Sequence, residues 1–531
     1  MKKLGSDADA KKLHDKLVGE KTGKGYVEGG GKVAKPAKGA PAKGAAKTGK
    51  AAKGAPVERV GKPEVIVIPA GAYRLEVVEG KSSKFWQIHR NDKTVTVTFG
   101  KIGTPGTVQK KKHKDEWKAR GDFNKQLEDK KKKGYQFVMA GPRVTPPPAA
   151  LNPQLEAAVV KDPSDDAFLV YGDWLMEQGD PRGDMAALRG DDNKKQAAAA
   201  KLAWKNRAFF YGPLAVFVTE KAEYPAVEAT WRHGWMDTLR LSAINMWQDG
   251  VIPVGDAAEL VRLLPKVSSA RMLRELVIGS PVSDSEFNFR ETIKELVKAM
   301  PQLPNLRRVF FGDFTYEDSE LSWSNLGPLK DFWPVAGKLE YLKIHAGSME
   351  LGKIDAPELR ELWIETGGFD KKNVESIQNA NMPKLETLNL WFGQDNYGCD
   401  VQVKHLAALI EALPKKFPKL RHLGIANSTW GNELAPILVK AKIVKQLETL
   451  DLSRSHLTDQ GIKVYADANP FKHLASLDVS ECLLGKEGKK LAKALAKSVN
   501  VDDQDDPSDH QPDPDDPGEK DSWWRYSRVG E

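Results

Sequence analysis

The side chains best suited to recognising a partner lie at alternate positions of short apolar segments between residues 339 and 391. In a strand, alternate side chains point to opposite faces, so the apolar residues should face a core and the intervening residues should face outward. Aromatic rings among mixed polar neighbours form the hot spots of many protein interfaces. We therefore predict a protein-binding surface made of Tyr341, Lys343, His345, Trp363, Glu365, Asn389 and Trp391.

The two tryptophans are the strongest candidates in this set. Strand geometry offers no core-packing reason for a tryptophan at an outward position. We expect Trp363 and Trp391 to lie one above the other on adjacent strands, where they would anchor an unknown protein partner. The alternative is that long loops fold over both rings, in which case the rings only stabilise the chain.

The sequence lacks the residue patterns of common catalytic and metal sites. It contains no His-Glu-x-x-His, Gly-x-Ser-x-Gly or Cys-x-x-Cys motif, and its ten histidines are scattered. His345 and His422 fall at outward strand positions, but neither has a patterned serine, cysteine or metal ligand as a partner. We predict a protein without catalytic residues, metal ligands or a cofactor.

One leucine phrase, repeated nine times, positions the outward residues. Each full copy has a leucine, two variable residues, a second leucine, one variable residue and a branched apolar residue, and the copies begin 20 to 37 residues apart. One such unit cannot bury its apolar face alone, whereas stacked neighbours share a continuous core. The copies lie at residues 236–241, 273–278, 306–311, 339–344, 359–364, 385–390, 420–425, 447–452 and 474–479.

This pattern resembles the leucine-rich repeat family, which implies an α/β solenoid of horseshoe shape over residues 236–498. Amphipathic helices are expected between the phrases, for example at residues 291–299 and 403–413. Before the repeats, residues 152–190 hold two predicted helices, and Asn152 should cap the first. This segment resembles the short repeat-companion domain of myxobacteria and planctomycetes, and we expect it to cover the open end of the solenoid core.

A second unit, at residues 70–140, carries the other chemical candidates. Three alternating segments there predict strands, and a glycine-rich turn and a helix at residues 114–133 follow them. This order resembles the WGR domain, named for a Trp-Gly-Arg strand end that precedes a glycine turn. In the poly(ADP-ribose) polymerase members of that family, the tryptophan packs on a DNA sugar and the arginine reaches phosphate. Phe99 and Lys101 stand at these two positions here.

The resemblance implies a nucleic-acid-binding face with reduced specificity. Phenylalanine still offers a ring for stacking, but lysine supplies a point charge where arginine supplies a planar fork. Residues 130–133 add four more lysines to the same unit. The predicted nucleic-acid contacts are Phe99, Lys101, Lys110, Lys111, Lys112 and Lys114. The alternative is that the lysines form the solvated face of a purely structural domain.

The two ends of the chain differ in charge. Residues 1–57 hold 14 Lys and Arg against 5 Asp and Glu, whereas residues 502–521 hold ten carboxylates and one lysine. Both compositions predict disorder, so we expect a basic arm at residues 1–62 and an acidic tail at residues 499–531. The arm is either a polyanion-binding segment or a solubilising linker. The carboxylates of the tail are candidates to compete with nucleic acid for the basic arm.

Composition also predicts a cytoplasmic protein. The chain has only two cysteines, which suits a reducing compartment. Its N-terminus lacks the apolar run of a signal peptide, and no stretch approaches 18 consecutive apolar residues.

Two connections complete the predicted organisation, a Pro-rich linker at residues 141–151 and a helical or irregular passage at residues 191–235. We predict a non-enzymatic adaptor whose basic arm and WGR-like unit hold DNA or another polyanion and whose repeats hold a protein. One alternative is a protein-interaction scaffold with a structural WGR-like unit. Another, a regulatory subunit of a DNA- or ADP-ribose-related enzyme, rests on analogy with WGR relatives.

Overall fold

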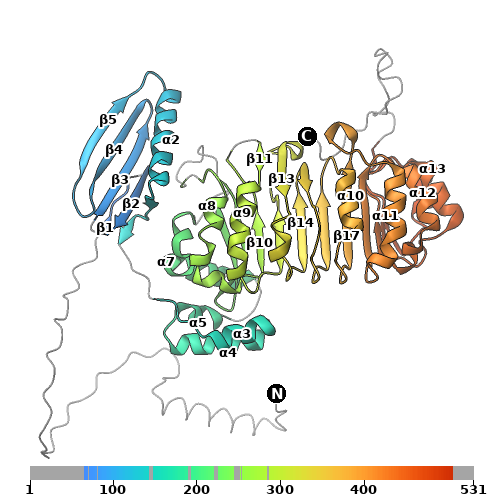
Figure 1. Ribbon diagram of the computed structural model, residues 1–531, viewed down its shortest axis with the longest axis horizontal. Coiled ribbons are helices and arrows are strands. Elements are labelled where there is room, and N and C mark those ends of the chain that lie inside the picture. Colours follow the sequence, from blue (N-terminus) through green and yellow to red (C-terminus); the bar gives the residue numbers. More distant parts are fainter. Residues whose placement is uncertain are drawn as a thin grey trace, which may run out of the picture. The chain divides into compact units, whose positions relative to one another are not determined.

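The computed structural model of the 531-residue chain describes residues 65–69, 71–80, 82–142, 148–188, 193–219, 225–243, 252, 254–283 and 286–505 (Figure 1). All of them belong to one compact unit, Lys62–Glu531. The predicted basic arm at residues 1–62 lies outside the described residues, as do the acidic tail from residue 506 and the stretch 143–147 of the predicted linker.

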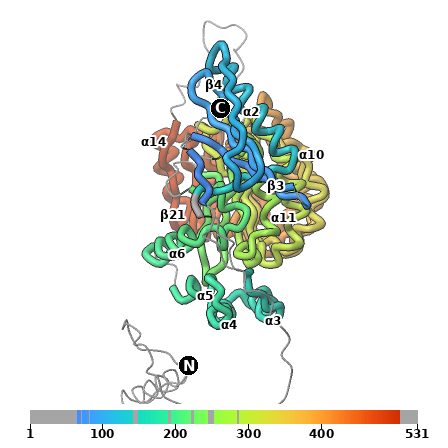
Figure 2. The backbone as a smooth tube through the Cα atoms, turned by 90° about the vertical axis from the view of Figure 1, so that its left-hand side faces the viewer, coloured from blue at the N-terminus to red at the C-terminus, as the bar shows by residue number. Residues whose placement is uncertain are grey.

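The first part of the described chain is an antiparallel five-stranded sheet in the order β5-β4-β3-β2-β6, called the small sheet here. Helix α2 (Glu116–Lys132) packs against one face of it (Figures 1 and 2). Asp115 begins the helix by accepting a hydrogen bond from the backbone N–H of Lys118. The strands are β2 (Ala72–Glu79), β3 (Ser82–Asn91), β4 (Thr94–Lys101), β5 (Thr107–Lys112) and β6 (Gln136–Phe137).

Alternation within these strands supplies the core of the small sheet. Leu75, Trp86 and Val97 point toward α2 and pack with Phe123 and Leu127 of the helix. Strand β5 was not predicted, because all six of its residues are exposed and it shows no apolar alternation.

The predicted linker at residues 141–151 is wrong at its first two residues. Strand β7 (Gly141–Pro142) pairs antiparallel with β1 (Val65–Ile66), which precedes the predicted start of the unit. The unit therefore closes with a second, two-stranded sheet before the chain continues.

Three helices follow, α3 (Pro153–Lys161), α4 (Asp165–Glu177) and α5 (Pro181–Ala186). Asn152 caps α3 as predicted, since its side chain accepts from the backbone N–H groups of residues 154 and 155. Helices α3 and α4 share a small core in which Phe168 and Tyr171 meet Trp235. Arg182 is fully buried, pairs with Asp180 at 2.7 Å and lies 4.3 Å from the Trp235 ring centroid.

The covering role predicted for residues 152–190 falls mainly to the residues after them. Helices α6 (Asn193–Lys205) and α7 (Arg207–Phe210) and the 3-10 helix η1 (Gly212–Val216) contribute Phe210 and Leu214 to the main core. The core residues of α3 and α4 form a separate cluster. An ion pair between Glu156 and Arg271, 2.7 Å long, also holds α3 to the segment before β10.

Eleven strands form the large sheet, in the order β21-β20-β19-β18-β17-β16-β14-β12-β10-β9-β8. From β9 to β21 neighbouring strands run parallel, and β8 pairs antiparallel with β9. The strands are β8 (Val227–Arg232), β9 (Trp235–Leu241), β10 (Glu275–Ile278), β12 (Arg308–Phe311), β14 (Tyr341–His345), β16 (Glu361–Glu365), β17 (Thr387–Gly393), β18 (His422–Ser428), β19 (Thr449–Asp451), β20 (Ser476–Asp478) and β21 (Ser498–Asn500). Each of the nine leucine phrases contains part or all of one strand.

Helices lie in most of the connections between the parallel strands and cover one face of the large sheet (Figure 1). The phrase leucines, such as Leu388 and Leu450, are buried with Leu296 and Leu409 of these helices in one continuous core. The α-helices are α8 (Ala258–Val261), α9 (Arg290–Ala299), α10 (Lys371–Gln378), α11 (Val403–Lys416), α12 (Gly431–Lys440), α13 (Asp459–Ala468) and α14 (Lys486–Ala492). The 3-10 helices are η2 (Leu264–Lys266), η3 (Ser268–Met272), η4 (Met300–Gln302), η5 (Leu321–Trp323), η6 (Trp333–Val335), η7 (Asp395–Tyr397) and η8 (Lys442–Gln446).

A third sheet is parallel and three-stranded, in the order β11-β13-β15. Its strands are β11 (Phe287–Asn288), β13 (Ser324–Pro328) and β15 (Ser348–Glu350). They lie between the leucine phrases, and at two to five residues they are too short to show a pattern in the sequence.

The acidic tail predicted at residues 499–531 begins too early. Residues 498–500 form β21, and the backbone N–H groups of Val479 and Glu481 donate to the carbonyls of Asn500 and Asp502. These bonds extend the ladder of the large sheet through residue 502. None of the helices in the described part of the chain has the length and apolarity that a membrane crossing requires.

Candidate functional site

Phe99 and Lys101 lie in β4 on the face of the small sheet that carries α2. Phe99 is directly opposite Trp86 of β3, and Lys101 is directly opposite Lys84. Because paired residues of antiparallel strands point to the same face, two lysines stand together beside the Phe99 ring. Phe99 is 37% exposed, whereas Trp86 is buried beneath the helix.

Helix α2 and the residue after it add more positive charge here. The Lys130 ammonium lies 5.5 Å from the Trp86 ring centroid and 4.8 Å from that of Tyr135. Burial lowers the pKa of Lys130, and the charges of Lys133 and Lys84 lower it further. We call Lys84, Phe99, Lys101, Lys130 and Lys133 the basic surface. Among the described residues, no carboxylate lies within ion-pair distance of these four lysines.

A glycine turn positions the end of β4. A Cβ atom on Gly106 would lie 2.6 Å from the Phe85 ring and 2.8 Å from the Phe99 carbonyl oxygen, and its φ is +75°. Only glycine lets the turn approach so closely with this backbone conformation. The Thr104 backbone N–H and hydroxyl both donate to the Lys101 carbonyl, which holds the strand end in place.

The other predicted lysines do not join one surface. The register of β4 and β5 points Lys111 to the α2 face, where its ammonium pairs with Asp122 at 3.2 Å. Lys110 and Lys112 alternate with Lys111 and so point to the opposite face. Lys114 is exposed just before α2. Of the five predicted lysines, only Lys101 belongs to the basic surface.

Sequence reasoning left Lys84 out of the predicted contacts. The hairpin register of β3 and β4, set by the turn at residues 92–93, places Lys84 opposite Lys101. Counting outward from that turn would have identified the pair, because a hairpin loop fixes the register of both strands.

On the large sheet, three of the predicted protein-binding residues form a charge network. The Lys343 ammonium lies 2.8 Å from Glu365, and His345 Nδ1 lies 3.0 Å from the other oxygen of that carboxylate. Burial raises the pKa of Glu365, but hydrogen bonds from His345 and Lys343 outweigh burial and leave it below its ordinary value. The neighbouring Tyr341 ring lies 3.7 Å from the Arg308 guanidinium.

The expectation that Trp363 and Trp391 lie one above the other is wrong. Trp363 is paired with Asn389, so Trp391 lies two residues further along its strand, in a different row of side chains. The phrase leucines set this register: Trp363 is the fifth residue of its phrase, whereas Trp391 follows the sixth residue of the next. Both rings are half-buried, and the Arg454 guanidinium lies 4.8 Å from the Trp391 ring centroid.

Asn389 is 5% exposed, and the nitrogen of its side-chain amide is hydrogen-bonded within the protein. Its Nδ2 donates to Asp451 at 3.0 Å, and its amide reaches that carboxylate across Gly424 of the strand between them. A Cβ atom on Gly424 would lie 2.3 Å from Asn389 Nδ2, so glycine is required there. Asn389 therefore ties three strands together and is a poor candidate for a partner contact.

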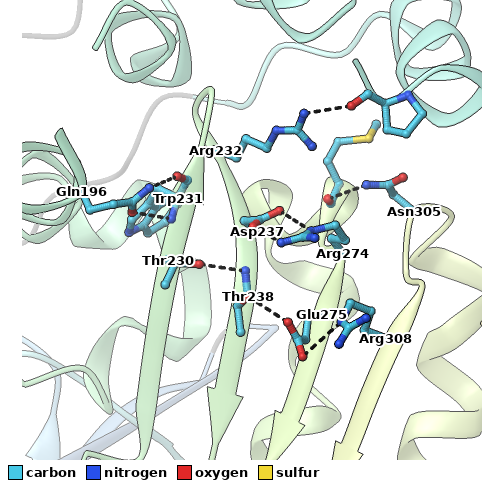
Figure 3. Close-up of polar contacts among 12 residues, drawn as sticks. Gln196, Thr230, Trp231, Arg232, Asp237, Thr238, Arg274, Glu275, Asn305 and Arg308 are labelled. Atoms are coloured by element: carbon cyan, nitrogen blue, oxygen red, sulfur yellow. Dashed lines mark hydrogen bonds and ion pairs between the residues drawn. The ribbon is translucent and has the colours of Figure 1, made fainter. Parts of the chain in front are cut away.

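Ion pairs also follow the beginnings of the strands, a feature that the sequence reasoning missed. Figure 3 shows the first of them, Asp237 with Arg274 at 2.8 Å and Glu275 with Arg308 at 3.5 Å. From Arg307 to Glu448, the residue after the first leucine of successive phrases alternates in sign, which is a readable signal. The later pairs are Arg307–Glu340 at 3.8 Å, Arg360–Glu386 at 2.5 Å and Arg421–Glu448 at 3.8 Å.

Comparison with known families identifies one part of the chain. Residues 72–141 match the WGR domain family, so the small sheet and α2 form a WGR domain. A WGR domain is an interaction module, which is compatible with an adaptor. A comparison with curated proteins gives no match.

The solved structures that are similar to the chain include the following two. One is a crystal structure of a Bacteroides fragilis protein, with 22% identity and a TM-score of 0.44, which covers 82% of this chain and 97% of that one. The other is an internalin from Listeria monocytogenes, with 15% identity and a TM-score of 0.21, covering 50% of this chain and 86% of that one.

Proposed function

We propose that this chain is a non-enzymatic adaptor whose WGR domain binds nucleic acid, with duplex DNA as the leading candidate. The observation that carries the proposal is the basic surface, where an exposed ring stands among four lysines that have no carboxylate partner among the described residues. Lysines without a carboxylate partner can pair with phosphates and release counterions on binding. The Phe99 ring is available to stack on a sugar or a base.

The large sheet supplies the second half of the proposal. We infer that it is a leucine-rich-repeat solenoid, since the nine phrases contain its strands and their leucines share one core. Its outward face would bind a protein partner around Trp363 and Trp391, whose rings are half-buried. Because the charges around them are already paired, the partner would be recognised mainly by shape and apolar contact.

The test measures binding of the full chain to duplex DNA from about 50 to 200 mM salt, the range over which phosphate contacts weaken strongly. Lys101→Ala should reduce the slope of log K against log salt by about one unit. Phe99→Ala should lower the affinity roughly tenfold and leave the slope unchanged, since stacking releases no counterions.

Lys112→Ala is the matched control, because it removes the same charge from the opposite face of the same sheet. It should change binding less than Lys101→Ala. Equal effects of the two substitutions on DNA binding would mean that the affinity depends on the net charge of the chain and not on the position of the lysine. No DNA binding at about 50 mM salt would favour the alternative, a protein-interaction scaffold with a structural WGR domain.

A further inference from the structure

A hollow of about 490 Å³ lies on the third sheet, and neither proposed surface includes its residues. Phe287 and Ser324 form part of its floor. Its other lining residues are polar or aromatic: Glu286, Asn288, Ser322, Trp323, Asn325 and Ser348.

The strand register aligns the polar residues. Asn288 of β11 is paired with Asn325 of β13, and Asn325 is paired with Ser348 of β15. All three are exposed, so they form one outward row across strands that lie about 4.8 Å apart. Glu286 and Trp323 immediately precede the paired residues Phe287 and Ser324, and both line the hollow.

Trp323 is 51% exposed but is held by a well-bonded turn. It ends η5, and the following Ser324 hydroxyl donates to the Leu321 carbonyl at 2.6 Å and accepts from the Gly347 N–H at 2.8 Å. A Cβ atom on Gly347 would clash with the Leu321 carbonyl oxygen at 2.4 Å, so glycine allows the turn to lie against β15. The backbone that carries the indole is therefore held in place, which lowers the conformational entropy lost when a ligand binds to this turn.

The free polar groups offer both donors and acceptors. Among the described residues, the side chains of Glu286, Asn325 and Ser348 have no hydrogen-bond or ion-pair partner. An amide and a hydroxyl each donate and accept, and a carboxylate accepts. The lining contains no lysine or arginine, which makes the hollow a poor site for a phosphate or another anion.

We propose that this hollow binds a neutral sugar. A pyranose ring has an apolar face of C–H groups, which fits the exposed Trp323 ring, and hydroxyls at its edge that both donate and accept. The row formed by Asn288, Asn325 and Ser348 runs beside that ring and provides groups for successive sugar units of an extended polysaccharide. The partner class is thus separate from the nucleic acid and the protein of the proposed function.

The test is affinity electrophoresis of the full chain in gels that contain hydroxyethyl cellulose, laminarin or glycogen. At least one of these neutral polysaccharides should retard the protein. Trp323→Ala should raise the dissociation constant roughly tenfold, by the loss of one stacking contact. Asn325→Ala, at an exposed amide, should raise it less and serves as a second variant if Trp323→Ala misfolds.

Trp117→Ala is the matched control, because Trp117 is an exposed indole on α2, 74% accessible and outside the hollow. It should leave the retardation unchanged. Retardation by none of the three polysaccharides would overturn the proposal, and so would an equal loss in the Trp117 and Trp323 variants. Binding to dextran sulfate that is lost in Lys101→Ala would report the basic surface instead.

Discussion

The basic surface of the WGR domain and the outward face of the large sheet both carry lysines, but only one of them neutralises those lysines. Lys84 and Lys101 stand side by side, and no carboxylate among the described residues lies within ion-pair distance of either. On the large sheet, Lys343 and His345 share Glu365, and Arg308 lies between Glu275 and Glu361. The lysines of the first region therefore keep an uncompensated positive charge, whereas these basic residues of the second region are paired with carboxylates.

This difference separates two kinds of recognition. An uncompensated group of lysines attracts a polyanion over about a Debye length, and this attraction weakens steeply as the salt concentration rises. A surface of paired charges exerts little force at a distance and discriminates at contact, where each charge must find its complement. The same side-chain type thus suits different partners in the two regions.

Charge reversal on the basic surface should produce the largest effect. The double substitution Lys84→Glu and Lys101→Glu replaces two phosphate contacts with two repulsions, so DNA affinity at low salt should fall roughly 100-fold. Electrophoretic mobility shift or fluorescence anisotropy of a labelled duplex measures it. Lys343→Glu reverses one charge on the large sheet and is the control. It should leave the DNA affinity close to that of the unmodified chain. A loss of DNA affinity comparable to that of the double variant would contradict the distinction between the two regions.

Removing the shared carboxylate of the large sheet should have the next largest effect. Glu365 is 14% exposed, and Glu365→Ala leaves Lys343 and His345 without their acceptor. The free energy of unfolding should fall by about 1–3 kcal/mol, measured by urea denaturation. Glu386→Ala removes a carboxylate whose ion pair is much more exposed and should cost less than about 1 kcal/mol. Equal costs would show that the Glu365 network contributes no more than a surface pair.

The smallest expected effect is a dependence of stability on pH. The pKa of Glu365 is lower in the folded protein than its ordinary value of 4.5, so its ionised form favours folding. That contribution is present above the ordinary value and is lost as pH falls through the folded pKa. Glu365→Gln should therefore show a shallower decline in unfolding free energy than the unmodified chain below about pH 4.5, measured by urea denaturation at a series of pH values. Parallel declines would contradict this assignment.

Much of the fold could be predicted from local patterns. The leucine phrase contains the strands at residues 273–278 and 447–452 because spacing and alternation are properties of a few adjacent residues. Strand β5 carries no apolar alternation, and the strands of the third sheet are too short for any, so nothing in the sequence indicated them. Tertiary pairing supplies the hydrogen bonds that make these segments strands.

The candidate sites were less predictable, because they depend on register. A sequence motif predicted Phe99 and Lys101, but their neighbour Lys84 lies on the opposite strand of the hairpin, outside that motif. Trp363 and Trp391 were outward-facing as predicted, yet the pairing of Trp363 with Asn389 separates them by one row. A displacement of two residues along a strand keeps a side chain on the same face and changes its neighbours.

By itself, the sequence determined which residues face the core and which face outward, since alternation requires no knowledge of distant segments. It also determined the WGR domain, whose strand, turn and helix signals are contiguous. Only the tertiary structure decided which outward charges meet a partner. Glu365 neutralises two side chains of the neighbouring strand, while Lys84 meets another lysine. The physical reason is that charge compensation is a property of distance in space, and pairing between strands sets that distance.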